Sequence, residues 1–241
     1  MRHSPLIVAL DVETAGEARQ LVGALGDAAG FYKVGLELYA SAGMEFVREL
    51  KHDGHRVFLD LKLYDIGETV RRAVAAVARA GVDFLTVHGM RQAMQAAVLG
   101  RGEADLKLLA VTVLTSVDDR DLEQDGYSRG AAELVELRVR NAVADRMDGI
   151  VCSPVEAARV RSLAGPRAIL VTPGVRSPGA AAGDQKRIAT PAQAIFDGAD
   201  YLVIGRQITR AADPRAEARR IIEEIQEAAI HDVTAEVKSH G

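Results

Sequence analysis

The fold is decided by a repeated unit, and residues 56–81, "RVFLDLKLYDIGETVRRAVAAVARAG", are its clearest copy. The unit opens with a short apolar run over residues 56–62, which is typical of a β-strand buried on both faces. An amphipathic helical pattern follows over residues 68–81, and Gly81 stands where glycine commonly ends a helix. A buried strand followed by a helix is the building block of a parallel sheet covered by helices.

Further apolar runs of the same kind lie along the chain, separated by helical stretches. They occupy residues 6–11, 31–37, 83–88, 106–114, 149–153, 168–173 and 201–205. Eight such strands in 241 residues match a (β/α)8 TIM barrel of the α/β class. The alternative is a doubly wound open sheet, but its usual Gly-rich turn after the first strand is missing from residues 9–18, "ALDVETAGEA". We therefore predict the barrel.

Composition and charge limit the classes of protein that the chain can belong to. No linker or low-complexity tract divides residues 1–241, so we expect a single domain, with residues 231–241 as a frayed polar tail. The net charge of −4 argues against a nucleic-acid partner. No apolar stretch approaches the roughly 20 residues that a membrane span needs, and the first residues lack a signal-peptide pattern, so we expect a cytoplasmic protein without a membrane partner. The single cysteine, Cys152, is expected in the core.

Polar residues lie in the last part of nearly every expected strand or directly after it, towards the end of a barrel where active sites lie. They are Asp11, Lys33, Asp60, Lys62, His88, Thr115, Ser116, Gly205 and Arg206. Asp60 and Lys62 are two residues apart, so their side chains leave the same face of a strand. By themselves they could form a buried ion pair that holds the barrel mouth, but Lys33 on the next strand adds more charge than structure needs and favours function. We expect His88 to be a packed, hydrogen-bonded residue.

The segment after the seventh strand predicts a phosphate site. Residues 173–187 form a long Gly- and Ala-rich stretch, and loops of that length are usually functional or disordered. In TIM barrels phosphate binds where the loops after strands 7 and 8 meet. Gly205 can offer its backbone N–H, Arg206 a planar fork of donors, and Arg176 is a second candidate, although Arg206 could instead form a surface salt bridge. No metal-ligand motif is present, so we expect neither a metal nor a cofactor.

Several segments together resemble one family. Residues 59–69, "LDLKLYDIGET", resemble the D-x-K-x-x-D signature of the orotidine 5′-phosphate decarboxylase family. Its phosphate-loop and strand-8 segments are similar to residues 171–176 ("VTPGVR"), 183–195 ("GDQKRIATPAQAI") and 198–209 ("GADYLVIGRQIT"), and its pyrimidine-contact segment to residues 114–116 ("LTS"). The chain departs from the commonest pattern at Tyr64, Gly67 and Glu68, where His, Pro and Asn are frequent, which concerns local loop shape.

The resemblance implies decarboxylation of orotidine 5′-phosphate to uridine 5′-phosphate, the last step of de novo pyrimidine nucleotide synthesis, by a homodimer with shared active sites and no cofactor. Lys62 would protonate C6 of the pyrimidine, Asp60 would lie against the substrate carboxylate and orient Lys62, and Asp65 would act in the partner's site. The residues implied to bind substrate are Asp11, Lys33, Thr69 (from the partner), Thr115, Ser116, Arg176, Gln185, Gly205 and Arg206.

Two other functions stay open. A magnesium-dependent sugar-phosphate decarboxylase or aldolase can share the D-x-K-x-x-D barrel, but such relatives carry Glu, a metal ligand, where this chain has Lys33. A non-catalytic binder of a phosphorylated ligand is the second alternative, and it has no need of Lys62.

Overall fold

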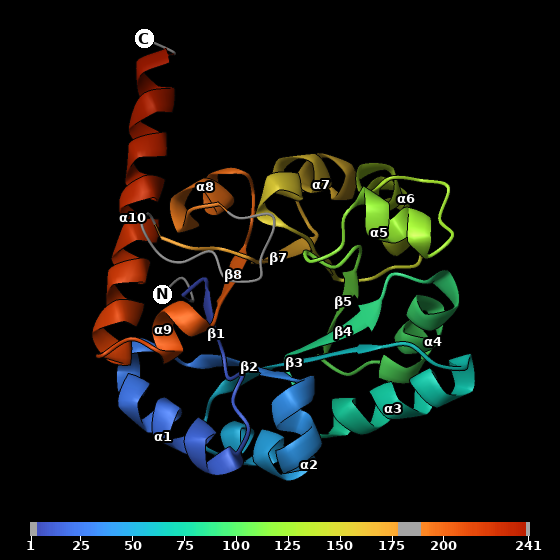
Figure 1. Ribbon diagram of the computed structural model, residues 1–241, viewed down its shortest axis with the longest axis horizontal. Coiled ribbons are helices and arrows are strands. Elements are labelled where there is room, and N and C mark those ends of the chain that lie inside the picture. The colour runs from blue at the N-terminus through green and yellow to red at the C-terminus, as the bar shows by residue number, and fades with distance from the viewer. Residues whose placement is uncertain (1–3, 178–188, 240–241) are drawn as a thin grey trace.

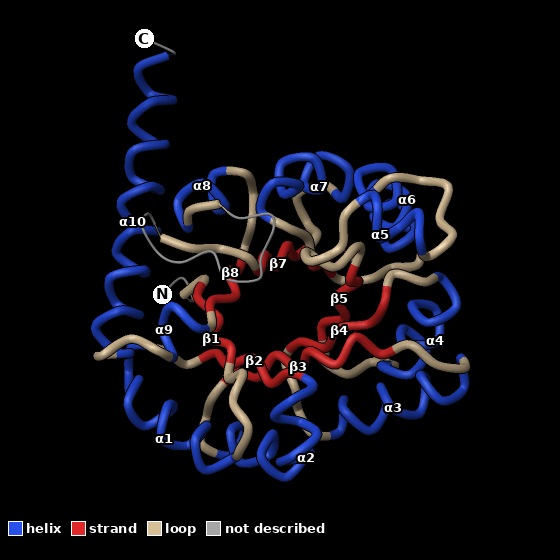
Figure 2. The backbone as a smooth tube through the Cα atoms, viewed as in Figure 1, coloured by secondary structure: helices blue, strands red, loops and turns tan. Residues whose placement is uncertain are grey.

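The strands close into a ring. The computed structural model describes residues 4–177 and 189–239, with residues 228–239 as backbone only. Each strand pairs in parallel with its neighbours in chain order, and β1 pairs with β8 to close the barrel (Figure 2). Helices surround this ring on the outside (Figure 1). The predicted (β/α)8 fold is confirmed.

All eight strands form within the predicted runs or within one residue of them. They are β1 (Leu6–Ala9), β2 (Phe31–Gly35), β3 (Arg56–Leu63), β4 (Phe84–His88), β5 (Lys107–Val111), β6 (Gly149–Val151), β7 (Ile169–Pro173) and β8 (Tyr201–Ile204). The helices are α1 (Ala15–Leu25), α2 (Leu36–His52), α3 (Gly67–Arg79), α4 (Arg91–Arg101), α5 (Asp119–Gln124), α6 (Ala131–Ala144), α7 (Ala157–Ala164), α8 (Pro191–Phe196), α9 (Arg206–Thr209) and α10 (Pro214–Ser239), with short 3-10 helices η1 (Gly26–Ala28) and η2 (Pro154–Glu156).

Local sequence signals set where the helices begin. Thr14 caps α1, because its hydroxyl accepts a hydrogen bond from the Glu17 backbone N–H while the Glu17 carboxylate accepts one from the Thr14 N–H. Asp213 accepts from the backbone N–H of Ala216 in the same way and starts α10. A cap of this kind stabilises a helix by about 1 kcal/mol.

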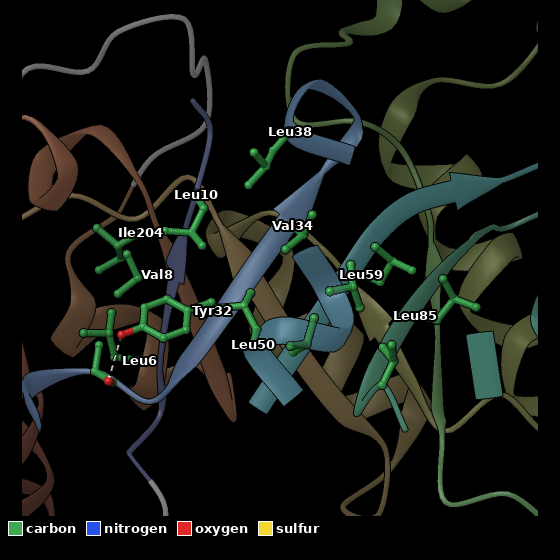
Figure 3. Close-up of a cluster of buried hydrophobic side chains, with 14 of the residues drawn as sticks. Leu6, Val8, Leu10, Tyr32, Val34, Leu38, Leu50, Leu59, Leu85 and Ile204 are labelled. Atoms are coloured by element: carbon green, nitrogen blue, oxygen red, sulfur yellow. Dashed lines mark hydrogen bonds between the residues drawn. The ribbon is translucent and has the colours of Figure 1, made fainter. Parts of the chain in front are cut away.

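Two apolar layers hold the barrel together. The outer layer lies between the strands and the helices and includes Tyr32, whose hydroxyl donates to the Ala29 carbonyl oxygen at 3.0 Å (Figure 3). The inner layer fills the barrel with the side chains of Ile7, Ala9, Phe31, Phe58, Phe84, Leu109, Val171 and Val203. At the N-terminal ends of the strands the Arg56 guanidinium stacks over the Phe31 ring, 4.0 Å from its centroid. The interior is therefore packed below the level at which the strands end.

The C-terminal helix is longer than the sequence predicts. Residues 231–239, expected to belong to a frayed tail, continue the backbone of α10 to Ser239. In Figure 1 this last part of α10 extends past the barrel. Fraying of these residues in solution stays a prediction.

Candidate active site

A cavity of about 470 Å³ opens at the C-terminal ends of the strands. That volume lies within the range of small-molecule sites. Strands β1, β2, β3, β5, β6, β7 and β8, or the residues that follow them, all contribute to its wall. The lining residues are Ala9, Asp11, Lys33, Glu37, Asp60, Lys62, Val111, Val113, Leu114, Thr115, Val151, Cys152, Pro173, Gly174, Arg176, Val203, Gly205, Arg206 and Arg210.

Along one wall the charges alternate in sign. Lys33 Nζ donates to Asp11 Oδ1 at 2.8 Å and lies 3.8 Å from Asp60 Oδ2. Lys62 Nζ donates to both carboxylate oxygens of Asp60, each at 2.9 Å. Three adjacent strands, β1, β2 and β3, together with Asp11 just after β1, thus bring Asp11, Lys33, Asp60 and Lys62 into a row at their carboxyl ends.

Asp60 is the centre of this row and its most buried carboxylate. Burial alone would raise the pKa of Asp60, but the charges of Lys33 and Lys62 and hydrogen bonds from Lys62 and Thr86 outweigh it, so the pKa lies below its ordinary value. Asp60 is therefore ionised at neutral pH. It holds the Lys62 ammonium, whose side chain is 31% exposed, beside the open part of the cavity.

Lys62 reaches the cavity through an irregular backbone. Its φ is 49°, in the left-handed region that non-glycine residues seldom adopt. On β3 the pairing with β4 jumps from Leu59 to Leu63, while on β4 it advances only from Leu85 to Val87. Asp60 and Lys62 do point toward one cavity, as expected, but a bulge rather than a regular strand sets their geometry.

The opposite end of the cavity is cationic. Arg176, Arg206 and Arg210 line it, and the backbone N–H of Arg176 donates to the Ala189 carbonyl oxygen at 3.0 Å. Burial, with the nearby positive charge of Arg206, lowers the pKa of Arg176. An anion between these guanidinium groups would relieve that repulsion, so this end suits a phosphate group. The sequence predicted Arg176 and Arg206 as candidates and missed Arg210, which follows Arg206 by one helical turn.

The remaining wall is apolar. It is made by Val111, Val113, Val151, Cys152, Pro173 and Val203. Cys152 is buried, as expected, and it also borders the cavity. A cavity with one charged wall, one apolar wall and one cationic end can orient a flat ligand that carries an anionic tail.

Gly35 is a site residue that the sequence prediction missed. A Cβ atom on Gly35 would lie 2.9 Å from Lys33 Nζ and 3.3 Å from Asp11 Oδ1. The glycine therefore leaves room for the Lys33–Asp11 pair. Its position inside the predicted strand 31–37, two residues after Lys33, was the available signal.

Some predicted site residues do not reach this cavity within one chain. Asp65 and Thr69 are exposed and are not among the lining residues, and the Asp65 carboxylate accepts from the backbone N–H of Ile66. Thr115 lines the cavity, whereas the neighbouring Ser116 is exposed and does not. Gln185 lies outside the described residues, together with the rest of residues 178–188.

His88 is packed as expected, but the predicted hydrogen bonding is wrong at one nitrogen. Its Nδ1 atom is buried and has no hydrogen-bond partner within the described residues, and its ring lies 5.7 Å from the Tyr64 ring. Burial, followed by the positive charges of Arg138 and Lys62, lowers the pKa of His88. The imidazole is therefore neutral at pH 7.

Among the side chains that the structure describes, in residues 4–177 and 189–227, no group of three or more His, Cys, Asp or Glu is arranged to hold a metal ion. None of the helices in the described part of the chain is both long and apolar enough to span a bilayer.

Fold and site together define a TIM-barrel protein whose cavity, at the carboxyl ends of the strands, has a row of Lys and Asp side chains and a cationic end suited to an anion. The chain belongs to the orotidine 5′-phosphate decarboxylase / HUMPS family, whose model matches residues 4–221.

Comparison with known proteins gives relatives over most of the chain. It is 53% identical over 223 residues to a protein named orotidine 5′-phosphate decarboxylase from Rhodopseudomonas palustris (strain HaA2), covering 92% of this chain and 95% of the relative. A relative of the same name from Methylobacterium sp. (strain 4-46) is 54% identical over 226 residues, covering 92% and 96%. The crystal structure of orotidine 5′-phosphate decarboxylase from Lactobacillus acidophilus superimposes with a TM-score of 0.82 at 36% identity, covering 92% of this chain and 99% of that one.

Proposed function

We propose that the protein decarboxylates orotidine 5′-phosphate to uridine 5′-phosphate, without a metal or organic cofactor. The observation that carries this proposal is the row Asp11–Lys33–Asp60–Lys62, which holds one partly exposed ammonium against a buried carboxylate in a cavity of nucleotide size. The family of the chain, and the name that its relatives share, support the same reaction.

In the proposed reaction the bond between C6 and the carboxylate breaks, the carboxylate leaves as carbon dioxide, and the electron pair of the bond stays on C6. The Lys62 ammonium stabilises this negative charge and then transfers a proton from Nζ to C6, which leaves a neutral amine that regains a proton from solvent. A charge held in place beforehand is the most effective way for a protein to stabilise such an intermediate. Asp60 holds the Lys62 ammonium in place through two hydrogen bonds, and its charge beside the substrate carboxylate disfavours the bound ground state.

The rest of the cavity would bind the nucleotide. We propose that the phosphate lies between Arg176, Arg206 and the backbone of Gly205, far from the reacting carbon, where its binding energy can support the chemical step. Asp11 and Lys33 would hold the ribose hydroxyls. Thr115 and Ser116 would contact the pyrimidine, and Gln185 would reach both phosphate and base.

We further propose a homodimer in which Asp65 and Thr69 complete the partner's site. Both residues are exposed next to two exposed apolar side chains, Tyr64 and Ile66, and this combination favours a protein interface over solvent. We propose no nucleic-acid or membrane partner and a cytoplasmic location, in keeping with the biosynthetic reaction.

Mixed dimers test the shared site. Lys62→Ala and Asp65→Ala proteins, each inactive alone, should regain about a quarter of wild-type activity when unfolded and refolded together, since half of the random dimers carry one intact site. Mixtures that stay inactive, while size-exclusion chromatography shows dimers, would contradict the shared site.

The reaction itself is tested by the loss of ultraviolet absorbance after mixing the protein with orotidine 5′-phosphate. We expect full turnover in the presence of EDTA, because the ammonium of Lys33 stands where the magnesium-dependent relatives carry a metal-binding Glu. Activity that disappears in EDTA and returns with magnesium would favour a sugar-phosphate enzyme. Binding of the nucleotide without any absorbance change would favour a non-catalytic binder.

A further inference from the structure

We infer that Thr86 is a positioning residue, whose hydroxyl fixes both the backbone of Lys62 and the carboxylate of Asp60 for the decarboxylation step. The inference rests on the proposed function. Thr86 does not line the cavity, so it acts through the two residues that do.

Thr86 lies opposite the β-bulge that interrupts the pairing of β3 with β4. Between the paired positions Leu59–Leu85 and Leu63–Val87, three residues of β3 stand opposite the single residue Thr86 of β4. The regular ladder of backbone hydrogen bonds cannot continue across this bulge, so the N–H of Lys62 needs another acceptor.

The Thr86 hydroxyl supplies that acceptor. The backbone N–H of Lys62 donates to Thr86 Oγ1 at 2.8 Å, and the same hydroxyl donates to Asp60 Oδ1 at 2.9 Å. Thr86 is 0% exposed, so water cannot readily take over either bond. One buried hydroxyl therefore ties the left-handed backbone of Lys62 to the carboxylate that holds the Lys62 ammonium.

Both bonds bear on the chemistry. The first stabilises a φ of 49°, which is costly for a residue with a side chain, and so sets the direction in which Lys62 leaves the strand. The second supplies a neutral donor to Asp60 and, together with the two lysines, keeps its carboxylate ionised and its rotamer fixed. An ammonium that misses C6 by a fraction of an ångström transfers its proton more slowly, even when the nucleotide binds normally.

The chain offers a matched control at Thr172 on β7. This threonine is also 0% exposed, but its hydroxyl has no hydrogen-bond partner among the described side chains and backbone, and it lies outside the cavity lining. Thr172→Val therefore makes the same chemical change in the same kind of strand without removing a bond to the site.

The experiment compares Thr86→Val, Thr86→Ser and Thr172→Val in the orotidine 5′-phosphate assay. We expect kcat to fall about tenfold to a hundredfold in Thr86→Val, equivalent to about 1.4–2.7 kcal/mol of barrier. Thr86→Ser, which keeps the hydroxyl, should stay within about threefold of wild type, and Thr172→Val within about twofold. The affinity for uridine 5′-phosphate should change less than about threefold in all three. Thr86→Ala replaces Thr86→Val in the comparison if the valine variant does not fold.

Two further readouts separate positioning from a general loss of stability. In Thr86→Val the acid limb of the kcat profile should move to higher pH, because Asp60 loses a donor that lowers its pKa. The amide hydrogen of Lys62 should exchange faster in Thr86→Val and at the wild-type rate in Thr172→Val.

The inference is overturned if Thr86→Val keeps wild-type kcat, if Thr86→Ser is impaired as strongly as Thr86→Val, or if Thr172→Val shows the same loss. An inactive wild-type protein would instead refute the proposed function. In that case the inference would still be tested separately: a Lys62 amide that exchanges at the same rate in Thr86→Val as in wild type would refute it.

Discussion

Asp60→Asn replaces the most highly bonded carboxylate of the site with a neutral group of the same shape. Asp60 accepts two hydrogen bonds from Lys62 and one from Thr86, all at 2.9 Å, and lies 3.8 Å from Lys33 Nζ. Its side chain is 13% exposed. After the substitution, the two ammonium groups of Lys33 and Lys62 would face an amide, and the attraction that offset their burial would be lost.

The loss of unfolding free energy depends on how much solvent contact or other ion pairing Lys33 and Lys62 keep after Asp60 is neutralised. Breaking a fully buried ion pair costs about 3–5 kcal/mol. Lys62 is 31% exposed, and Lys33 keeps its 2.8 Å bond to Asp11, so part of that cost is avoided. We expect Asp60→Asn to lower the free energy of unfolding by about 2–3 kcal/mol at pH 7.

Asp11→Asn is the matched control, because Asp11 also accepts a lysine hydrogen bond, at 2.8 Å, but its side chain is 49% exposed. Because the Asp11 carboxylate is half exposed and the buried Lys33 keeps its 3.8 Å contact with Asp60, this variant should lose less than about 1 kcal/mol. The chain has no tryptophan, so urea unfolding of the nucleotide-free protein is best followed by far-ultraviolet circular dichroism. A loss in Asp60→Asn no larger than that in Asp11→Asn would refute the assignment of Asp60 as the electrostatic centre of the site.

Two further predictions follow from the same row of charges. The pKa of Asp60 is lowered in the folded protein, so its ionised form contributes stability that is present above the unfolded pKa of about 3.9 and is lost as pH falls through the folded value. The difference in unfolding free energy between wild type and Asp60→Asn should therefore shrink below about pH 4 in urea titrations. A difference that grows below that pH would contradict the lowered pKa. Gly35→Ala places a Cβ atom 2.9 Å from Lys33 Nζ and should weaken binding of uridine 5′-phosphate about tenfold by calorimetry, whereas Gly30→Ala, with no atom within 4 Å of its added Cβ, should bind normally.

The barrel and the row of charges could be predicted from the sequence for one physical reason. Strands buried on both faces read as apolar runs, and in a parallel barrel the residues at and just after their carboxyl ends all meet at one end. The sequence pattern alone, without any side-chain contact, therefore predicted that one group of charged residues lies together: Asp11, Lys33, Asp60 and Lys62.

The bulge between β3 and β4 could not be predicted, because strand register depends on packing between residues distant in the sequence. Thr86 reads in the sequence as an ordinary strand residue of "DFLTVH" (83–88), and only the jump from Leu59 to Leu63 gives its hydroxyl a role. The space that Gly35 leaves for Lys33 is likewise a property of three strands together.

Asp65 and Thr69 show a different limit. Their proposed roles require a second subunit, and within one chain both residues are exposed and separate from the cavity. Neither the pattern of a single sequence nor the fold of a single chain can bring them to the reacting atoms, so the mixed-dimer experiment decides their part in the site.

The central claim is that the ammonium of Lys62, held by Asp60, delivers the proton to C6. The most direct measurement is the turnover of orotidine 5′-phosphate by Lys62→Ala, together with its affinity for uridine 5′-phosphate. We predict that turnover falls by at least about a thousandfold, since both the charge and the proton are removed, while the nucleotide still binds within about tenfold of wild type. A folded Lys62→Ala protein that decarboxylates at a rate near that of wild type would contradict the claim.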